Sequence, residues 1–475
     1  MSIHRISFIE AGAPGLHIFS KFPVVRVGTV LLSTILKEMG YEVKTFIEDI
    51  STPDWEFIEN SDLVCISTLT STAIRAYSIG HRLKAKGITV IMGGAHPTFM
   101  PEQALQYSDV VVRGEGDYTL PELMSYLDNG TPGIETIQGV SYMDKTGKFF
   151  HNPDRPLLNE KDLDTLPIPD FSLVHNWKAS LNYSLSTSRG CPFACKFCSV
   201  IHIFGREYRH KSTGSVLREL KHIRSVSKSN RFFVDDNFTA NRKRTKDLLR
   251  AMIVDNLTSS WTAQVRTDIA TDAELLRLMA DSGCRTVYIG FESINPKALE
   301  QYNKKQTLED IVRSIRALRD HGIRIHGMFV IGADTDNVDV IKRTVDFAIH
   351  NGIDTIQLMV LTPLPGTPLF KEMKENGRLL HTDWNKFDAH HTVFIPSLMS
   401  AQTLQTETMK GMGCFYSWKY ILKHLSKLDL YYAGIGIFGK STVNKMLGEF
   451  ATYRDKVLVQ SPGHAITSRK SKLFR

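Results

Sequence analysis

The stretch Thr187–Cys198, "TSRGCPFACKFC", places three cysteines within eight residues: Cys191, Cys195 and Cys198. The chain has 475 residues and only six cysteines, so half of them lie in this one segment. The other three lie far away, each in or beside an apolar run where a buried thiol is expected: Cys65, Cys284 and Cys414. The function therefore depends on which metal centre or reaction requires three neighbouring thiols without a fourth.

The composition is ordinary for a globular protein, with 42% apolar and 23% charged residues, and the length predicts two or three domains. The net charge of +8 is spread along the chain, apart from the basic end "SRKSKLFR", so no nucleic-acid partner is expected. No apolar run reaches the roughly 18 residues of a membrane span, and the N-terminus lacks a signal peptide's apolar region. We expect a cytoplasmic protein, in which clustered cysteines bind metal more often than they form disulfides.

In residues 1–148, short apolar runs alternate with amphipathic segments. Five runs resemble strands: "RISFIEA", "EVKTFIED", "DLVCIST", "GITVIMGG" and "DVVVRGEG". This alternation predicts a doubly wound, Rossmann-like parallel sheet, which binds ligands beyond the carboxyl ends of its strands. The loop residues at those ends are binding candidates, although the glycines are equally explained as turns: Thr68, Thr70, Gly93, Gly94, His96, Gly114 and Glu115. An ordinary dinucleotide site is disfavoured, because no G-x-G-x-x-G is present.

Residues 149–182 carry four prolines in "NPDRPLLNEKDLDTLPIPDF" and no long periodic segment, which predicts a linker. Six further strand candidates alternate with helical patterns in residues 183–380, beginning with "YSLSTS" and ending with "IDTIQLMVL". They predict a partial (β/α)6 barrel of the TIM type, with its site at the carboxyl ends of the strands. Residues 381–475 read as mainly helical.

The three cysteines directly follow the first barrel strand. Structural zinc takes four tetrahedral ligands. Three thiolates on one loop suit a cubane 4Fe–4S cluster instead, because each cysteine ligates one iron and the fourth iron stays open. That open iron can bind a substrate or cofactor, while zinc remains the alternative.

The spacing C-x-x-x-C-x-x-C, with Phe197 before the last cysteine, closely resembles the radical S-adenosylmethionine (radical SAM) superfamily. The resemblance implies a 4Fe–4S cluster on Cys191, Cys195 and Cys198, with S-adenosylmethionine (SAM) chelated to the open iron. Reductive cleavage of SAM would then give a 5′-deoxyadenosyl radical.

The resemblance continues at the ends of later barrel strands. "FVDDNF" stands where the family holds the methionine amino group, which implies that role for Asp235, Asp236 and Asn237, although the family's form is Gly-Gly-Glu. Arg266 in "AQVRTD" either pairs with the methionine carboxylate or is a solvated rim arginine. Three more positions resemble family contacts with the ribose or the adenosine, and the glycines among them could equally form turns: Glu292, Gly332 and Gly366.

The first domain resembles the cobalamin-binding domain that precedes the barrel in one radical SAM class, in "VGTVLLSTILKEMGYEV" and "VIMGGAHPTFMPEQAL". The resemblance therefore covers about the first 390 residues. The D-x-H-x-x-G motif that supplies a cobalt ligand elsewhere is absent, as it usually is in this class. We expect His96 to line the corrin pocket without ligating cobalt, the alternative being a loop histidine bonded to backbone.

These resemblances imply an enzyme that uses cobalamin to methylate an unactivated carbon. The expected partners are a small-molecule substrate that is bulky and apolar, and a low-potential electron-donor protein. Radical cyclisation, rearrangement or carbon–carbon coupling is the alternative. A non-enzymatic iron–sulfur scaffold would not need the cofactor-binding strand ends, and a tRNA-modifying enzyme would be expected to carry a basic RNA-binding domain. The segment "FYSWKYILKHLSKLDLYY" could contact a membrane peripherally, but we predict that its apolar side packs in the core.

Overall fold

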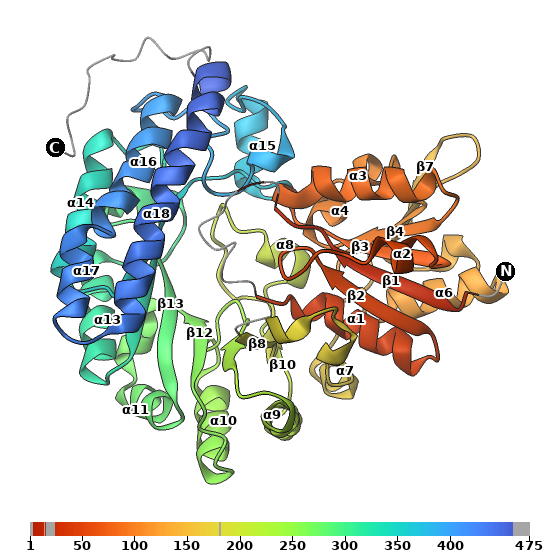
Figure 1. Cartoon of the computed structure of the whole chain (residues 1–475), viewed down its shortest axis with the longest axis horizontal. Helices are drawn as coiled ribbons and strands as arrows, with labels where there is room; N and C mark the ends of the chain where they lie inside the picture. The colour runs from red at the N-terminus through yellow and green to blue at the C-terminus, as the bar shows by residue number, and fades with distance from the viewer. Residues whose placement is uncertain (1–2, 14, 16–23, 180–181, 459–475) are drawn as a thin grey trace. The chain divides into compact units, whose positions relative to one another are not determined.

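The computed structural model describes residues 3–13, 15, 24–179 and 182–458 (Figure 1). The described chain forms two compact units. The first consists mainly of residues up to Cys191 together with Ser199–Phe232, and the second of Pro192–Cys198 together with the chain from Phe233 onward. The basic end "SRKSKLFR" lies outside the described residues.

Five parallel strands form the predicted doubly wound sheet of the first unit, in the order β2-β1-β3-β4-β5. The strands are β1 (Arg5–Glu10), β2 (Glu42–Ile47), β3 (Leu63–Ser67), β4 (Thr89–Gly93) and β5 (Val110–Val112). The connecting helices are α1 (Val27–Glu38), α2 (Trp55–Glu59), α3 (Ala73–Lys84), α4 (Ala95–Phe99) and α5 (Pro101–Leu105), with α6 (Thr119–Asn129) after β5. The strand order reverses between β1 and β3, and sheets of this kind bind ligands at such a reversal.

Two antiparallel strands, absent from the sequence prediction, extend this sheet beyond β5: β6 (Val140–Met143) and β7 (Phe149–His151). The turn between them is stabilised by Asp144, whose Oδ1 accepts from the backbone N of Thr146 at 2.8 Å and of Lys148 at 3.0 Å. β7 and the short α7 (Glu160–Thr165) both lie in the segment predicted as a linker. Strands of three or four residues are too short to show a clear alternating pattern.

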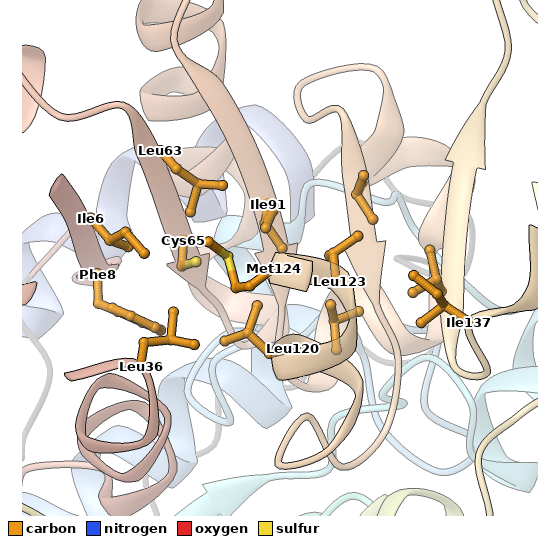
Figure 2. Packing of buried hydrophobic residues seen from close by; sticks show 13 residues of the cluster. Ile6, Phe8, Leu36, Leu63, Cys65, Ile91, Leu120, Leu123, Met124 and Ile137 are labelled. Atoms are coloured by element: carbon orange, nitrogen blue, oxygen red, sulfur yellow. The ribbon is translucent and has the colours of Figure 1, made fainter. Parts of the chain in front are cut away.

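The core of the first unit lies between this sheet and helices α1 and α6 (Figure 2). Helix α6 contributes Leu120, Leu123 and Met124, which share one face because they are three and four residues apart. From the sheet, Phe8 and Cys65 project into the same layer. Burial raises the pKa of the Cys65 thiol, so this cysteine is an inert part of the core, as predicted.

The six predicted barrel strands are all present, and their order in one sheet is β15-β14-β13-β12-β11-β8. They are β8 (Asn182–Leu185), β11 (Asn230–Phe233), β12 (Trp261–Val265), β13 (Cys284–Glu292), β14 (Arg324–Ile331) and β15 (Thr355–Val360). The helices between them are α9 (Thr213–Val226), α10 (Arg242–Val254), α11 (Ala273–Asp281), α12 (Pro296–Gln301), α13 (Leu308–Asp320) and α14 (Val338–His350). Each end strand has one neighbour, so the sheet is the open, partial barrel expected.

Four helices follow the barrel strands: α15 (Pro368–Glu375), α16 (Ala401–Phe415), α17 (Trp418–Leu425) and α18 (Leu430–Tyr453). Helix α16 packs against α14 and β15, and α17 packs against α18 (Figure 1). The segment 415–432 is divided between α17 and α18, because Ser417 and Asp429 each cap a new helix. The predicted core packing of its apolar side is wrong for its four leucines, Leu422, Leu425, Leu428 and Leu430, which are all exposed, whereas Ile421 is buried. Within the described part of the chain, no helix is long and apolar enough to cross a membrane.

Candidate functional site

The second and third cysteines lie on a loop that is fixed to the second unit by its backbone. Lys196 N donates to Tyr302 O at 3.1 Å, and Asn303 Nδ2 donates to Ala194 O at 2.8 Å. The Phe197 ring packs edge-on against Tyr302, with 5.3 Å between ring centroids. The aromatic residue of the cysteine motif thus anchors the loop to the Tyr302 segment of the second unit.

The first cysteine is positioned by the segment after α8 (Val200–Phe204). Its amide N donates to Gly205 O at 3.3 Å. Gly190, the residue before it, has φ +85°, and a Cβ there would lie 2.2 Å from the carbonyl oxygen of Glu207. Only glycine fits this position, which the sequence motif did not single out.

None of the three thiols of the motif is in a disulfide; Cys195 is buried, and Cys191 and Cys198 are partly exposed. In the part of the chain that is described, no three His, Cys, Asp or Glu side chains converge as they would around a single metal ion. A cubane cluster does not require its ligands to converge on one point, because each thiolate ligates a different iron atom. Three cysteines on one loop, none of them in a disulfide, therefore fit the cluster in number and chemistry.

The segment after β11 offers polar groups for a ligand. Asp235 and Asn237 are buried, whereas Asp236 is exposed. Desolvation by the surrounding protein and the neighbouring Asp235 raise the pKa of Asp236 to about 7. Among the described residues, Asn237 Nδ2 is a buried donor with no partner, while its Oδ1 accepts from Thr239 Oγ1 at 3.3 Å. A carboxylate beside an unsatisfied amide suits the zwitterionic amino-acid group of SAM.

Arg266 is buried, so the prediction of a solvated rim arginine is wrong. Its guanidinium lies 3.7 Å from the centroid of the Phe193 ring, and its Nη2 donates to Lys304 O at 2.5 Å. Phe193 belongs to the cysteine loop. This arginine therefore clamps the loop from the end of β12 through a cation–π contact.

Glu292 is also engaged with the protein. It forms a buried ion pair with Lys304, with Nζ and Oε1 2.6 Å apart. Glu292 has φ +59° at a bulge between β13 and β14, and the missing Cβ of Gly290 leaves room for the pair. The sequence offered no signal for Lys304, because its partner is twelve residues away on another element.

The two glycines predicted to lie along the adenosine both have left-handed backbones, with φ +118° at Gly332 and +81° at Gly366. At Gly332 a Cβ would also approach Leu404 at 3.0 Å and Phe394 at 3.1 Å. The turn alone therefore accounts for the glycine at Gly332.

At the strand ends of the first unit, His96 is fully buried. Its Nδ1 lies 3.3 Å from Thr70 Oγ1 and its Nε2 lies 2.9 Å from Tyr77 Oη. Burial lowers the pKa of His96 to about 4, so the ring is neutral at physiological pH. Thr68 is buried as well, and its Oγ1 contacts Thr72 Oγ1 at 2.8 Å.

The glycines of these strand ends differ in their surroundings. Gly94 has φ +99°, and a Cβ there would lie 2.6 Å from the carbonyl oxygen of Thr68, whereas at Gly93 it would be 3.4 Å from Val112 O. Gly114 has φ +69° with nothing within 4 Å of the Cβ position. Of the three, Gly114 has open space beside it.

Glu115 holds two arginines inside the first unit. Its carboxylate accepts from Arg209 at 3.0 and 3.1 Å, and its Oε1 lies 3.1 Å from Arg189 Nη1. Arg189 also forms two hydrogen bonds with Asp117, at 2.8 and 2.9 Å. Since Arg189 precedes Cys191 by two residues, the strand end of β5 fixes the entry to the cysteine loop. The only sign of this ion-pair network in the sequence is the presence of charged residues beside glycines in "RGEGD" and "TSRGC".

Sequence profiles match both halves of this arrangement. The profile described as the radical SAM superfamily matches residues 185–348, and the profile described as a B12 binding domain matches residues 19–124. Both matches agree with the resemblances found in the sequence.

Two relatives and one solved structure extend the comparison. The chain is 32% identical over 372 residues to a bacteriochlorophyllide d C-12(1)-methyltransferase of Chlorobaculum tepidum, covering 77% of this chain and 76% of that protein. It is 27% identical over 351 residues to an anaerobic magnesium-protoporphyrin IX monomethyl ester cyclase of Rubrivivax gelatinosus, covering 71% and 62%. The fold matches the radical SAM methyltransferase TsrM of Kitasatospora setae, solved with cobalamin and a 4Fe–4S cluster, with a TM-score of 0.68 at 20% identity, covering 79% and 78%.

The chain therefore belongs to the radical SAM superfamily, in the class that carries a B12-binding domain. More closely, it is an enzyme of the cobalamin-dependent radical SAM methyltransferase family. The cofactors of that family are a 4Fe–4S cluster, SAM and cobalamin.

Proposed function

We propose that this enzyme methylates an unactivated carbon of a bulky, largely apolar small molecule. The observation that carries the proposal is the combination, in one chain, of a B12-binding domain with a radical SAM barrel that has three closely spaced cysteines on one loop. The names of the two relatives, a bacteriochlorophyllide methyltransferase and a protoporphyrin ester cyclase, support the substrate class.

When bound, the cluster and SAM supply a carbon-centred radical after reduction by a low-potential donor protein, and cobalamin supplies a methyl group. The residues of the chain bind and orient these groups. Cys191, Cys195 and Cys198 would hold the cluster. Asp236 would accept from the ammonium of SAM, and Asn237 Nδ2 would donate to its carboxylate.

The other predicted contacts divide by their surroundings. Arg266 and Glu292 are already committed to Phe193 and Lys304, and they act by shaping the site. In the first domain, the strand-end loops that contain Gly94 form the proposed cobalamin surface. Of the residues predicted there, Gly114 has open space beside it, whereas Thr68, His96 and Glu115 are buried and act by shaping the loops.

The test is the corrinoid content per cluster in protein made anaerobically with cobalamin supplied. We expect about one corrinoid per cluster, on the basis of one site for each cofactor. Cys198→Ala should lose the iron–sulfur absorption and all formation of 5′-deoxyadenosine. Cys414→Ala, a partly buried thiol outside the motif, is the matched control and should lose neither. An intact cluster that cleaves SAM without any corrinoid would overturn methyl transfer from cobalamin.

Radical cyclisation is the second candidate, because one relative of similar coverage is a named cyclase. SAM labelled with deuterium in its methyl group distinguishes the two reactions. Methylation transfers the labelled methyl carbon to the product. Cyclisation gives an unlabelled product that has lost hydrogen.

A further inference from the structure

A cluster of exposed apolar side chains lies at the turn between α17 and α18. Of the 17 large apolar side chains that are exposed in the described part of the chain, seven fall within twenty residues. We call them the apolar tip: Trp418, Leu422, Leu425, Leu428, Leu430, Tyr431 and Ile437. Single exposed leucines are common on protein surfaces, but seven large apolar side chains within twenty residues of two packed helices indicate a binding surface.

Helix α17 has two apolar sides, and only one is used for packing. Tyr420, Ile421 and His424 are buried, and they join the helix to its neighbours. Trp418, Leu422 and Leu425 share a different face, because they are four and three residues apart. Trp418 is 63% exposed and Leu422 is 61% exposed, so nothing in the described chain covers this face.

Positive charge surrounds the apolar tip. Lys419, Lys423 and Lys427 are exposed beside it, and Lys440 Nζ lies 6.0 Å from the centroid of the Trp418 ring. Asp429 is the only acidic residue between Glu407 and Glu449 in the sequence. Its carboxylate is paired with Arg324 at 2.7 Å, so it does not offset the lysines.

We propose that the apolar tip inserts into the interface of a membrane that contains anionic lipids. An apolar face bordered by lysines, on helices that do not span the bilayer, is the pattern of an interfacial helix. The lysine stems lie along the apolar surface while their ammonium groups reach lipid phosphates. The inference is independent of the reaction that the enzyme catalyses.

Charge argues against two other occupants. The chain end, residues 459–475, contains four Lys and Arg residues and no acidic residue, so it would be repelled by the lysines. A second copy docked through the same patch would place lysines against lysines, because a two-fold interface is self-complementary. Anionic lipid is the partner whose charge and apolarity both match.

The test is cosedimentation of the full chain with vesicles of equal parts phosphatidylcholine and phosphatidylglycerol, and with phosphatidylcholine alone. We expect binding to the anionic vesicles, a blue shift of Trp418 emission, and weaker binding at high salt. Leu422→Ser/Leu425→Ser should reduce the partition coefficient at least about tenfold, because two leucines that the proposal places in the membrane interface are lost. Lys419→Gln/Lys423→Gln should reduce it by a similar factor.

Val254→Ser/Ile349→Ser is the matched control, since both side chains are exposed in the same unit but lie outside the apolar tip. It should bind vesicles as the wild type does. All three variants should keep the wild-type circular dichroism, since the changed residues are exposed. The proposal is overturned if the wild type does not bind anionic vesicles, or if Leu422→Ser/Leu425→Ser binds equally well. It is also overturned if sedimentation velocity shows a wild-type dimer that this variant converts to monomer.

Discussion

Removing the Glu115 carboxylate should strongly destabilise the first unit. The Glu115 and Arg209 side chains are each only 3% exposed, so solvent stabilises a lone charge poorly at this position. In Glu115→Leu, Arg209 keeps its bonds to the carbonyl oxygens of Leu158 and Phe204 but loses its counterion. Breaking a buried pair in this way typically lowers the free energy of unfolding by about 3–5 kcal/mol. That is a large fraction of the roughly 5–15 kcal/mol that stabilises a domain.

Urea unfolding of the cofactor-free chain, followed by circular dichroism, measures this loss. The double variant Glu115→Leu/Arg209→Met should recover part of it, because apolar residues can replace a buried ion pair with little loss and Arg189 keeps its two bonds to Asp117, while Leu158 N stays without its acceptor. Glu42→Gln, which breaks an exposed pair with Arg5, is the control and should change nothing measurable. The reasoning is refuted if Glu115→Leu costs less than about 1 kcal/mol, or if the double variant is no more stable than the single one.

Three further outcomes are expected. Gly94→Ala places a Cβ 2.6 Å from the carbonyl oxygen of Thr68 at a residue with φ +99°, so it should lower the free energy of unfolding, measured by urea titration, by about 1–3 kcal/mol. The control is Gly28→Ala in α1, where the Cβ position is open. It should raise the free energy of unfolding by up to about 1 kcal/mol. Burial lowers the pKa of His96 and of His326 to about 4, so the unfolded state binds protons at a higher pH than the folded state does. The free energy of unfolding should therefore fall as the pH drops from about 6.5 to 4. In His96→Asn, the dependence of this free energy on pH should be about half as steep. Because Asp236 has a pKa of about 7, SAM affinity measured by equilibrium dialysis should weaken below pH 7 in the wild type, and Asp236→Asn should bind weakly at every pH.

Much of the fold could be predicted because long strands and helices leave periodic patterns. The eleven predicted strands of the two sheets are all present, and each was predicted from its own short segment of sequence. β6 and β7 depend instead on a turn built around Asp144 and on pairing with β5, which no local pattern records. Helix α17 shows the opposite difficulty, since its pattern has two apolar sides and the sequence does not tell which one is buried.

The part of the candidate site that lies within one segment is visible in the sequence, and the contacts between distant segments are not. The three cysteines lie within one loop, so their spacing identifies that loop directly. Glu292 and Glu115 were expected to contact ligands, and Arg266 either a ligand or solvent; in the structure these side chains contact Lys304, Arg209 and Phe193. A buried charge must be neutralised by some group, and the sequence does not show whether that group is a ligand or another side chain.

This difference also indicates where ligand binding energy is concentrated. Charged groups that the protein has already paired gain little from a ligand, because a new contact only replaces an existing one. Asp236 and Asn237 differ, since one is an exposed carboxylate with a raised pKa and the other holds a buried amide nitrogen without a partner among the described residues. Binding of SAM would satisfy both groups at once, so substitutions there should weaken binding directly. Substitutions at Arg266 should instead act through the position of the cysteine loop, and they should reduce cluster content before they reduce SAM affinity.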